Sequence, residues 1–209
     1  MEADDRLLVG FLEEAQRRGL LGPPPVGEHI AHARAFAEVI EATGAWPGHA
    51  VDLGAGGGIP GLVLALHEPE CSWMLLDSRD RAARFLSDAT AKLGLAGRVD
   101  VVHERAEVVG RSTRRGRADV VLARAFGPPA AAAECAAPLL RIGGRLVVSE
   151  PPDASSPDRW DSAALDQLGM GPAEAGVYAG VHFVVVTQRS LCPDRFPRRS
   201  GVPARRPLF

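Results

Sequence analysis

The sequence feature that most constrains this chain is the glycine-rich segment at residues 51–61, which reads Val-Asp-Leu-Gly-Ala-Gly-Gly-Gly-Ile-Pro-Gly. An apolar strand carrying Asp52 passes directly into a loop that has almost no side chains. Such a loop can adopt positive φ and lets a ligand come closer to the backbone than a Cβ would permit. Pro60 suits the first turn of a helix, whose N-terminus would face the same ligand. The segment therefore predicts a site for a small-molecule cofactor, although tight helix–sheet packing alone could also explain the glycines.

The segments around this loop alternate between apolar strands and amphipathic helices. Strands are expected at residues 50–53, 73–77, 99–103, 119–122 and 145–149, and helices at 60–67, 81–93 and 130–140. Two helices, at 7–15 and 28–43, come before them, while a loop at 151–157, a short helix at 160–168 and a strand pair at 176–178 and 181–187 come after. This order predicts an α/β fold of the Rossmann-like class: a doubly wound, mostly parallel sheet with N-terminal helices and an antiparallel C-terminal hairpin.

Composition limits the class of protein further. The 209 residues include 46% apolar residues, enough for one α/β domain with small extensions. We expect a helical extension at 1–48, the cofactor-binding domain at 49–190 and a basic tail at 191–209 without regular structure. The three cysteines are far apart and form no metal-binding pattern, so no metal is expected. The acidic N-terminus and the lack of a long apolar run predict a cytoplasmic protein outside the membrane, with a monomer as the default.

Asp77 narrows the choice of cofactor. It ends the second strand 23 residues after Gly54, where a doubly wound fold places the acid that binds a ribose, although a helix cap is an equally simple role. NAD and S-adenosylmethionine sites share this feature. Gly56, Gly58 and Gly61 match the glycine spacing of dinucleotide-binding loops, but the match starts two residues after Gly54, where the strand ends and the pattern should begin. Asp52 favours S-adenosylmethionine, because a carboxylate there would attract the methionine ammonium and repel a pyrophosphate. NAD-dependent oxidation is the weaker alternative.

Several motifs together resemble one family. They are residues 51–61, Leu76-Asp77-Ser78 followed by Arg81 and Arg84-Phe85-Leu86, Arg105-Ala106-Glu107, Ala123-Arg124-Ala125-Phe126, and the segment at 196–203. The chain thereby resembles the RsmG (GidB) family of bacterial methyltransferases, which modify guanine N7 in 16S rRNA of the small ribosomal subunit.

The resemblance implies a role for each matching residue. Gly54 and Ile59 would line the methionine and ribose end of S-adenosylmethionine, together with Asp52, Gly56, Gly58, Asp77 and Ser78. Ala106 and Glu107 would hold the adenine. Arg124 would lie beside the cofactor at the mouth of the substrate pocket and act as the catalytic residue, unless it is only a surface arginine. No general base is expected, because guanine N7 carries an in-plane lone pair and no proton.

The substrate side departs from the family pattern. His29 keeps part of a family element and is a candidate substrate contact, as are Arg198 and Arg199 of the tail. The basic run at 111–117 could be a solvated loop or a phosphate contact. Glu150 stands where the family usually has lysine, and a carboxylate there should repel RNA.

Three hypotheses follow from these observations. The first is an S-adenosylmethionine-dependent methyltransferase acting on guanine N7 of small-subunit rRNA. The second keeps this chemistry but uses a small molecule or another RNA as the acceptor. The third is a catalytically weak cofactor-binding module with an interaction role.

Overall fold

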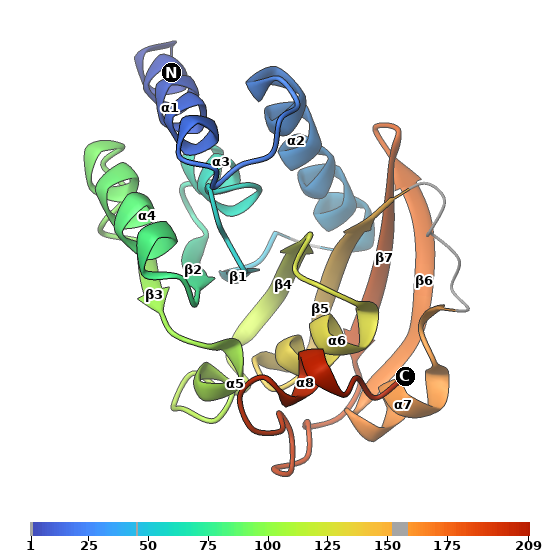
Figure 1. Ribbon diagram of the computed structural model, residues 1–209. Coiled ribbons are helices and arrows are strands. Elements are labelled where there is room, and N and C mark those ends of the chain that lie inside the picture. Colours follow the sequence, from blue (N-terminus) through green and yellow to red (C-terminus); the bar gives the residue numbers. More distant parts are fainter. Residues whose placement is uncertain (1, 45, 152–158) are drawn as a thin grey trace.

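The computed structural model describes residues 2–44, 46–151 and 159–209 and has one seven-stranded sheet at its centre (Figure 1). The strands are β1 (His49–Leu53), β2 (Ser72–Asp77), β3 (Val99–His103), β4 (Ala118–Arg124), β5 (Leu140–Glu150), β6 (Met170–Tyr178) and β7 (Val181–Gln188). Their order across the sheet is β3-β2-β1-β4-β5-β7-β6. The first five strands are parallel, whereas β7 runs antiparallel between β5 and β6. The predicted fold class is confirmed, including the antiparallel hairpin at the end.

Helices cover both faces of this sheet. They are α1 (Glu2–Arg17), α2 (Val26–Thr43), α3 (Gly61–His67), α4 (Asp80–Lys92), α5 (Ala106–Val109), α6 (Pro129–Ala136), α7 (Ser162–Gln167) and α8 (Val202–Arg205). The first four pack on one face and the last four on the other (Figure 1). The two N-terminal helices and the C-terminal tail thus pack against the same sheet as the central elements.

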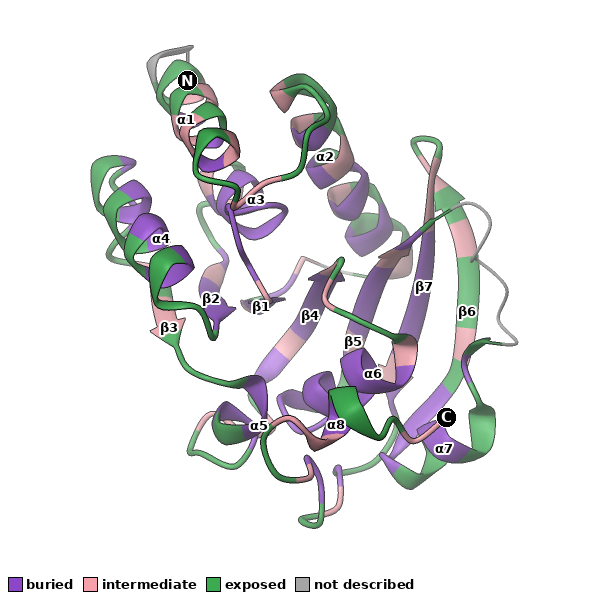
Figure 2. Ribbon diagram, viewed as in Figure 1, coloured by how far each residue is buried: buried purple, intermediate pink, exposed green. Residues whose placement is uncertain are grey.

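Strand β4 shows why the core has two halves. Val120 and Leu122 face the apolar cluster under α1 to α4, while Val121 and Ala123 face the cluster under α5 to α7. This alternation follows from the two-residue period of a strand. A central parallel strand is buried on both faces and therefore reads as a continuous apolar run. Figure 2 shows the buried residues concentrated in these central strands.

The expected helix at 130–140 is too long and the strand after it too short. Helix α6 ends at Ala136, and β5 begins at Leu140. The pair Gly143-Gly144 does not form a turn before the strand but lies inside a bulge where the register with β4 shifts. Gly143 adopts a φ of 81°, and a Cβ on Gly144 would lie 2.8 Å from the carbonyl oxygen of Ala118. The glycines therefore permit an irregular strand, not its start.

Two further expectations about the C-terminal part need correction. Strand β6 is longer than expected and begins at Met170, and the tail contains the short helix α8. Of the loop expected at 151–157, residues 152–157 lie outside the described residues.

Candidate active site

The glycine-rich loop joins β1 to α3 and packs tightly on all sides. Gly54 has a φ of +79°, and a Cβ on it would lie 2.8 Å from Cδ2 of Phe126. A Cβ on Gly61 would lie 2.5 Å from Leu75 and 2.6 Å from the Asp52 carboxylate. All three contacts are shorter than real Cβ atoms make, so the loop requires glycine at these positions.

Asp52, in β1, is hydrogen-bonded to the far end of this loop. Its side chain is buried, and its Oδ2 accepts a hydrogen bond of 2.7 Å from the Gly61 backbone N–H. Burial raises the pKa of Asp52 to about 7, although the Gly61 hydrogen bond opposes the shift. Asp52 is not among the described residues on the wall of the neighbouring cavity, and its expected contact with a methionine ammonium stays a prediction. Its carboxylate faces the interior and fixes the turn.

Gly56, Gly58 and Ile59 also shape the loop instead of lining that cavity. The Gly56 N–H donates to Oδ2 of Asp77 at 2.9 Å, which ties the loop to the end of β2. Gly58 has a φ of +94° and packs against Leu62 of α3. The side chain of Ile59 is buried in the core on the α1 to α4 side. The structure shows that these residues shape the loop, and their expected contacts with the cofactor stay a prediction.

A first cavity of about 340 Å³ opens at the carboxyl ends of β1 and β2. Gly54, Asp77, Ser78, Ala106 and Glu107 all lie on its wall, so the structure brings together five of the residues expected to bind cofactor. The turn after β4, helix α6 and the tail complete the wall with residues that include Ala125, Phe126, Ala131, Cys135, Gly201, Pro203 and Ala204. Carboxyl ends of parallel strands are the usual place for ligands in such sheets.

Asp77 is ionised and held in position on this wall. Its Oδ1 accepts from the backbone N–H and Nε of Arg79 at 2.8 and 3.1 Å, and its Oδ2 accepts from Nη2 of Arg79 at 3.1 Å. Burial raises the pKa of Asp77, but these hydrogen bonds and that from Gly56 outweigh it and leave the pKa below its usual range. The Asp77 carboxylate is therefore available as an acceptor for hydroxyl groups in the cavity.

Glu107 links the first cavity to the tail. Its Oε1 accepts a hydrogen bond of 2.6 Å from the Gly201 N–H, which fixes the start of α8 against α5. Pro203 and Ala204 of α8 then cover one side of the cavity. Hydrophobic periodicity did not predict this wall, because a tail rich in Pro and Arg has no helical period, and the one signal for it was the family motif at 196–203.

A second cavity of about 610 Å³ lies on the other side of β4. It is lined by residues from the ends of β4, β5 and β7, and Arg124, Phe126, Glu150 and His182 are among them. Ala125 and Phe126 line both cavities. Ala125 adopts a φ of 53°, which is uncommon for a residue other than glycine. The turn after β4 is therefore the shared wall between the cavities.

His29 fixes Arg124 at this wall. Nη2 of Arg124 lies 2.7 Å from Nδ1 of His29, and Nε2 of His29 lies 3.1 Å from the carbonyl oxygen of Gly22. Because arginine only donates, His29 must accept through Nδ1 and donate to Gly22 through Nε2, which makes it neutral. Burial and the Arg124 charge lower the pKa of His29, although the Gly22 hydrogen bond opposes them. His29 was expected to contact substrate, but its side chain is buried and positions Arg124 instead.

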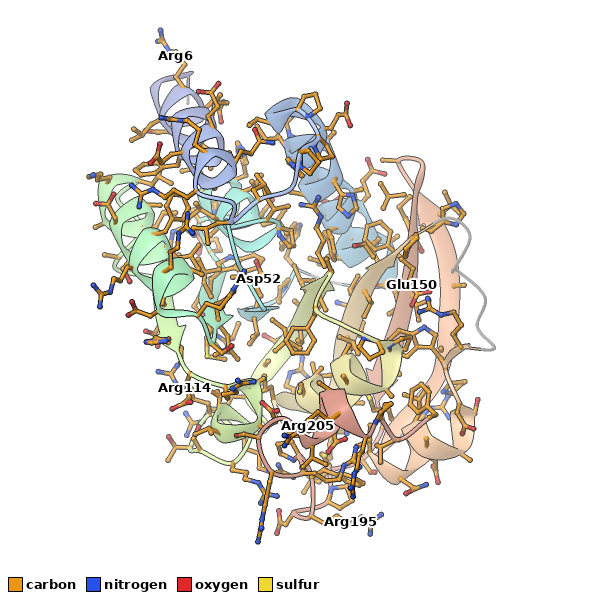
Figure 3. The ribbon with its side chains drawn as sticks, viewed as in Figure 1. Arg6, Asp52, Arg114, Glu150, Arg195 and Arg205 are labelled. Carbon is orange, nitrogen blue, oxygen red and sulfur yellow. The ribbon has the colours of Figure 1, made fainter. Side chains whose placement is uncertain are left out.

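Glu150 ends β5 on the wall of the second cavity. Its Oε1 accepts a hydrogen bond of 3.1 Å from Nε1 of Trp160, and its Oε2 pairs with Nη1 of Arg159 at 3.1 Å. In Figure 3, Glu150 and Asp52 lie on opposite sides of β4. Sequence reasoning identified Glu150 only as an unfavourable charge and did not predict that other side chains hold it.

The tail arginines are used differently from what was expected. Arg198 donates from Nε and Nη2 to the fully buried carboxylate of Glu134, with distances of 2.6 to 3.0 Å. The expected phosphate contact of Arg198 is thus replaced by an internal ion pair. Within the basic run, Arg111 and Arg115 donate to backbone carbonyls of the tail, including those of Pro197 and Phe196. Arg199, in contrast, is exposed.

Two titratable side chains on the described walls of the cavities are unsuited to act as a nucleophile or a base near neutral pH. Burial raises the pKa of the Cys135 thiol beside the first cavity, so it stays protonated. Burial and the Arg124 charge lower the pKa of His32 in the second cavity to about 4. Among the described residues, no group of three or more His, Cys, Asp or Glu could hold a metal ion. No helix in the same part of the chain is long and apolar enough to cross a membrane.

The order and directions of the strands define the fold as Rossmann-like, of the class I methyltransferase type. The structure is similar to that of an S-adenosylmethionine-dependent O-methyltransferase from Thermotoga maritima, with a TM-score of 0.58 and 15% sequence identity. The similar region covers 76% of this chain and 64% of that chain.

The family follows from the sequence itself. Residues 11–150 match the family described as GidB, rRNA small subunit methyltransferase G. The chain is 33% identical over 207 residues to the ribosomal RNA small subunit methyltransferase G of Syntrophomonas wolfei, covering 95% of both proteins. It is 37% identical over 171 residues to the enzyme of that name from Rubrobacter xylanophilus, covering 77% of this chain and 65% of that protein. The chain belongs to this family, which confirms the resemblance seen in its motifs.

Proposed function

We propose that this protein is an S-adenosylmethionine-dependent methyltransferase that methylates N7 of a guanine in small-subunit rRNA. The observation that carries the proposal is the pair of cavities that share the wall at Ala125 and Phe126. Methyl transfer needs a donor and an acceptor that meet in line, and two cavities meeting at one wall supply this arrangement.

The residues of the first cavity fit S-adenosylmethionine. Asp77 offers an ionised acceptor for the two ribose hydroxyls, and Ser78 lies beside it. Ala106, Leu53 and Leu76 form an apolar part of the wall that suits an adenine ring. Gly54 lines this cavity in close contact with Phe126, which lines both cavities, so the methionine part would approach the second cavity here. When bound, the cofactor supplies a methyl group attached to a positively charged sulfur.

The acceptor chemistry suits the side chains of the second cavity. Guanine N7 has a free lone pair and no proton, so the protein must position the base and has no proton to remove. The pKa of about 4 for His32, one of the two histidines among the described residues that line this cavity, agrees with this. The work of the site is then alignment, which can contribute a large part of a rate enhancement.

Arg124 positions the base in this proposal. Guanine presents O6 and N7 side by side as acceptors. An arginine that bound both atoms would cover N7, but His29 holds one guanidinium nitrogen of Arg124 at 2.7 Å. The remaining N–H groups can donate to O6 and leave N7 open. His29 therefore acts as a positioning residue and Arg124 as the catalytic one.

The RNA substrate is supported by family membership and by the basic tail. Arg199 is exposed beside a third cavity that Arg111 and Ser112 also line, and this surface can meet phosphates. A cytoplasmic location follows from the proposal, since ribosomal subunits are there.

The proposal is tested by incubating the protein with labelled S-adenosylmethionine and small ribosomal subunits or naked rRNA from cells that lack their own enzyme of this family. We expect label in the rRNA and binding of S-adenosylhomocysteine by calorimetry. Cofactor binding without any incorporation would remove the rRNA substrate and favour a small molecule or another RNA. Binding of NAD alone would remove the methyltransferase proposal.

A further inference from the structure

The proposed function leaves one charged group of the second cavity without a role. Glu150 is the only carboxylate among the described residues that line this cavity. Its side chain is only 4% exposed, and it is held between Trp160 and Arg159. A buried carboxylate is costly unless it is paired and hydrogen-bonded, and here two donors from the segment before α7 meet this cost.

The two donors do not use up the carboxylate. Oε1 accepts one hydrogen bond from Trp160 and Oε2 accepts one from Arg159. A carboxylate has about four acceptor positions in total, so each oxygen can accept another hydrogen bond. Glu150 thus presents two adjacent acceptors in a fixed orientation. A ligand edge with two adjacent donors would match them.

The position of Glu150 follows from the strand order. The first cavity lies at the ends of β1 and β2, the shared wall follows β4, and Glu150 ends β5, the next strand beyond β4. A guanine whose N7 faces the shared wall turns its opposite edge toward β5 and β7. That edge carries N1–H and the N2 amino group, which are two adjacent donors. Enzymes that act on an extruded base commonly read it by this edge.

We infer that Glu150 accepts hydrogen bonds from N1–H and the N2 amino group of the acceptor guanine and thereby selects guanine. This inference rests on the function proposed above. The sequence alone predicts that the Glu150 carboxylate should repel RNA phosphates. In this proposal the carboxylate lies on the wall of the second cavity and contacts a base instead of a phosphate. Adenine carries an acceptor at N1, so it would place an acceptor against the carboxylate.

The same contact favours the transfer step. The N7–CH₃ bond forms as the S–CH₃ bond breaks, and the positive charge moves from sulfur to the guanine ring without loss of a proton from N7. The ring then becomes a stronger donor at N1–H. Its hydrogen bond to Glu150 strengthens as the charge develops, and only interactions of this kind accelerate a chemical step. Glu150 thus contributes to kcat as well as to the choice of base.

The test uses small-subunit rRNA in which the methylated guanine, first mapped with the wild-type protein, is replaced by a single inosine. Inosine keeps N7, O6 and N1–H and lacks only the N2 amino group. We expect the wild-type protein to prefer guanine over inosine by at least about tenfold in kcat/KM, the value for one hydrogen bond to a charged group. In Glu150→Gln, we expect kcat/KM on guanine to fall by about a hundredfold and the preference to approach one.

Two measurements separate this role from a structural one. Trp160→Phe removes one donor to Glu150 but keeps the carboxylate, and it should retain the preference for guanine. The affinity of Glu150→Gln for S-adenosylhomocysteine should equal that of the wild type, which shows that the variant is folded.

Each adverse outcome has a distinct meaning. A wild-type preference near one overturns the inference without any variant. An unchanged preference in Glu150→Gln overturns it as well, while wild-type transfer to guanine keeps the proposed function intact. No transfer by the wild type to either RNA overturns both.

Discussion

The first and second cavities lie on either side of the turn after β4 and are built in different ways. The first is formed largely by a loop without side chains and by the ends of β1 and β2, with Asp77 bound to Gly56 and to the nearby Arg79. The second depends on side chains brought together from distant segments. His29 and Arg124, for example, are 95 residues apart in the sequence.

This difference matches what each half must do. A cofactor that many enzymes share can be bound by backbone groups and one acidic side chain. Such a site tolerates few substitutions. An acceptor is recognised by side chains, which can be exchanged while the sheet stays the same. The replacement of the family's usual lysine by Glu150 falls in the second half.

The largest expected effect is in the second cavity. Arg124→Ala should lower kcat/KM for rRNA methylation by about 10² to 10³, the usual cost of removing one well-placed donor. The affinity for S-adenosylhomocysteine should change little. Arg17→Ala, which removes an exposed arginine paired with Glu14 on α1, serves as the control. Turnover of Arg124→Ala at the wild-type rate would refute the role of Arg124.

The ion pair between Arg198 of the tail and the buried Glu134 gives a prediction that is measured as the stability of the fold. Arg198→Ala leaves the buried Glu134 carboxylate without its main partner and should destabilise the fold by about 3 kcal/mol. Urea unfolding measures this loss. Arg199→Ala should unfold like the wild type, because Arg199 is exposed. Equal stability of the two variants would contradict the assigned difference between neighbouring arginines.

Gly54 tests how closely the cofactor approaches the loop. Gly54→Ala places a Cβ 2.8 Å from Phe126 at a φ of +79° and should weaken S-adenosylhomocysteine binding by at least about tenfold. Gly116→Ala is a matched control, since Gly116 has a φ of +68° with open space around it. Gly116→Ala should lose about as much folding stability from the positive φ as Gly54→Ala does, but it should keep its affinity for S-adenosylhomocysteine. If both variants bind alike, Gly54 does not face the cofactor.

Asp52 tests the boundary of the first cavity. Its pKa is about 7 in the folded protein and 3.8 ordinarily, so folding disfavours its ionised form. Its contribution to stability is therefore lost as the pH rises from about 4 through 7. Asp52→Asn should melt like the wild type near pH 4 and about 10 °C higher above pH 7. Unchanged affinity for S-adenosylhomocysteine is expected, whereas a large loss would restore the predicted ammonium contact.

The smallest effect concerns RNA phosphates. Arg199→Ala should weaken rRNA binding a few-fold and reduce the slope of log affinity against log salt concentration by about one. A filter-binding titration over several salt concentrations measures both quantities. The same slope as the wild type would mean that Arg199 does not contact a phosphate.

Sequence reasoning predicted the sheet and most of the first cavity, because alternating strands and helices place their carboxyl ends together. It could place Gly54 and Asp77 at one site from their positions at the ends of strands, whereas Ala106 and Glu107 were placed there by the resemblance to the family. It could not foresee that His29 supports Arg124, because that contact depends on how α2 packs over the end of β4. For Arg198, residue type indicated charge but not its buried partner.

The most direct test of the account is the position of the methyl group in rRNA methylated by the wild-type protein. Reduction of the RNA followed by aniline cleavage breaks the chain at N7-methylguanine. We expect cleavage at a single guanine, at the nucleotide that carries the label. Label without cleavage would place the methyl on another atom and contradict a site that aligns N7 with the cofactor and needs no base.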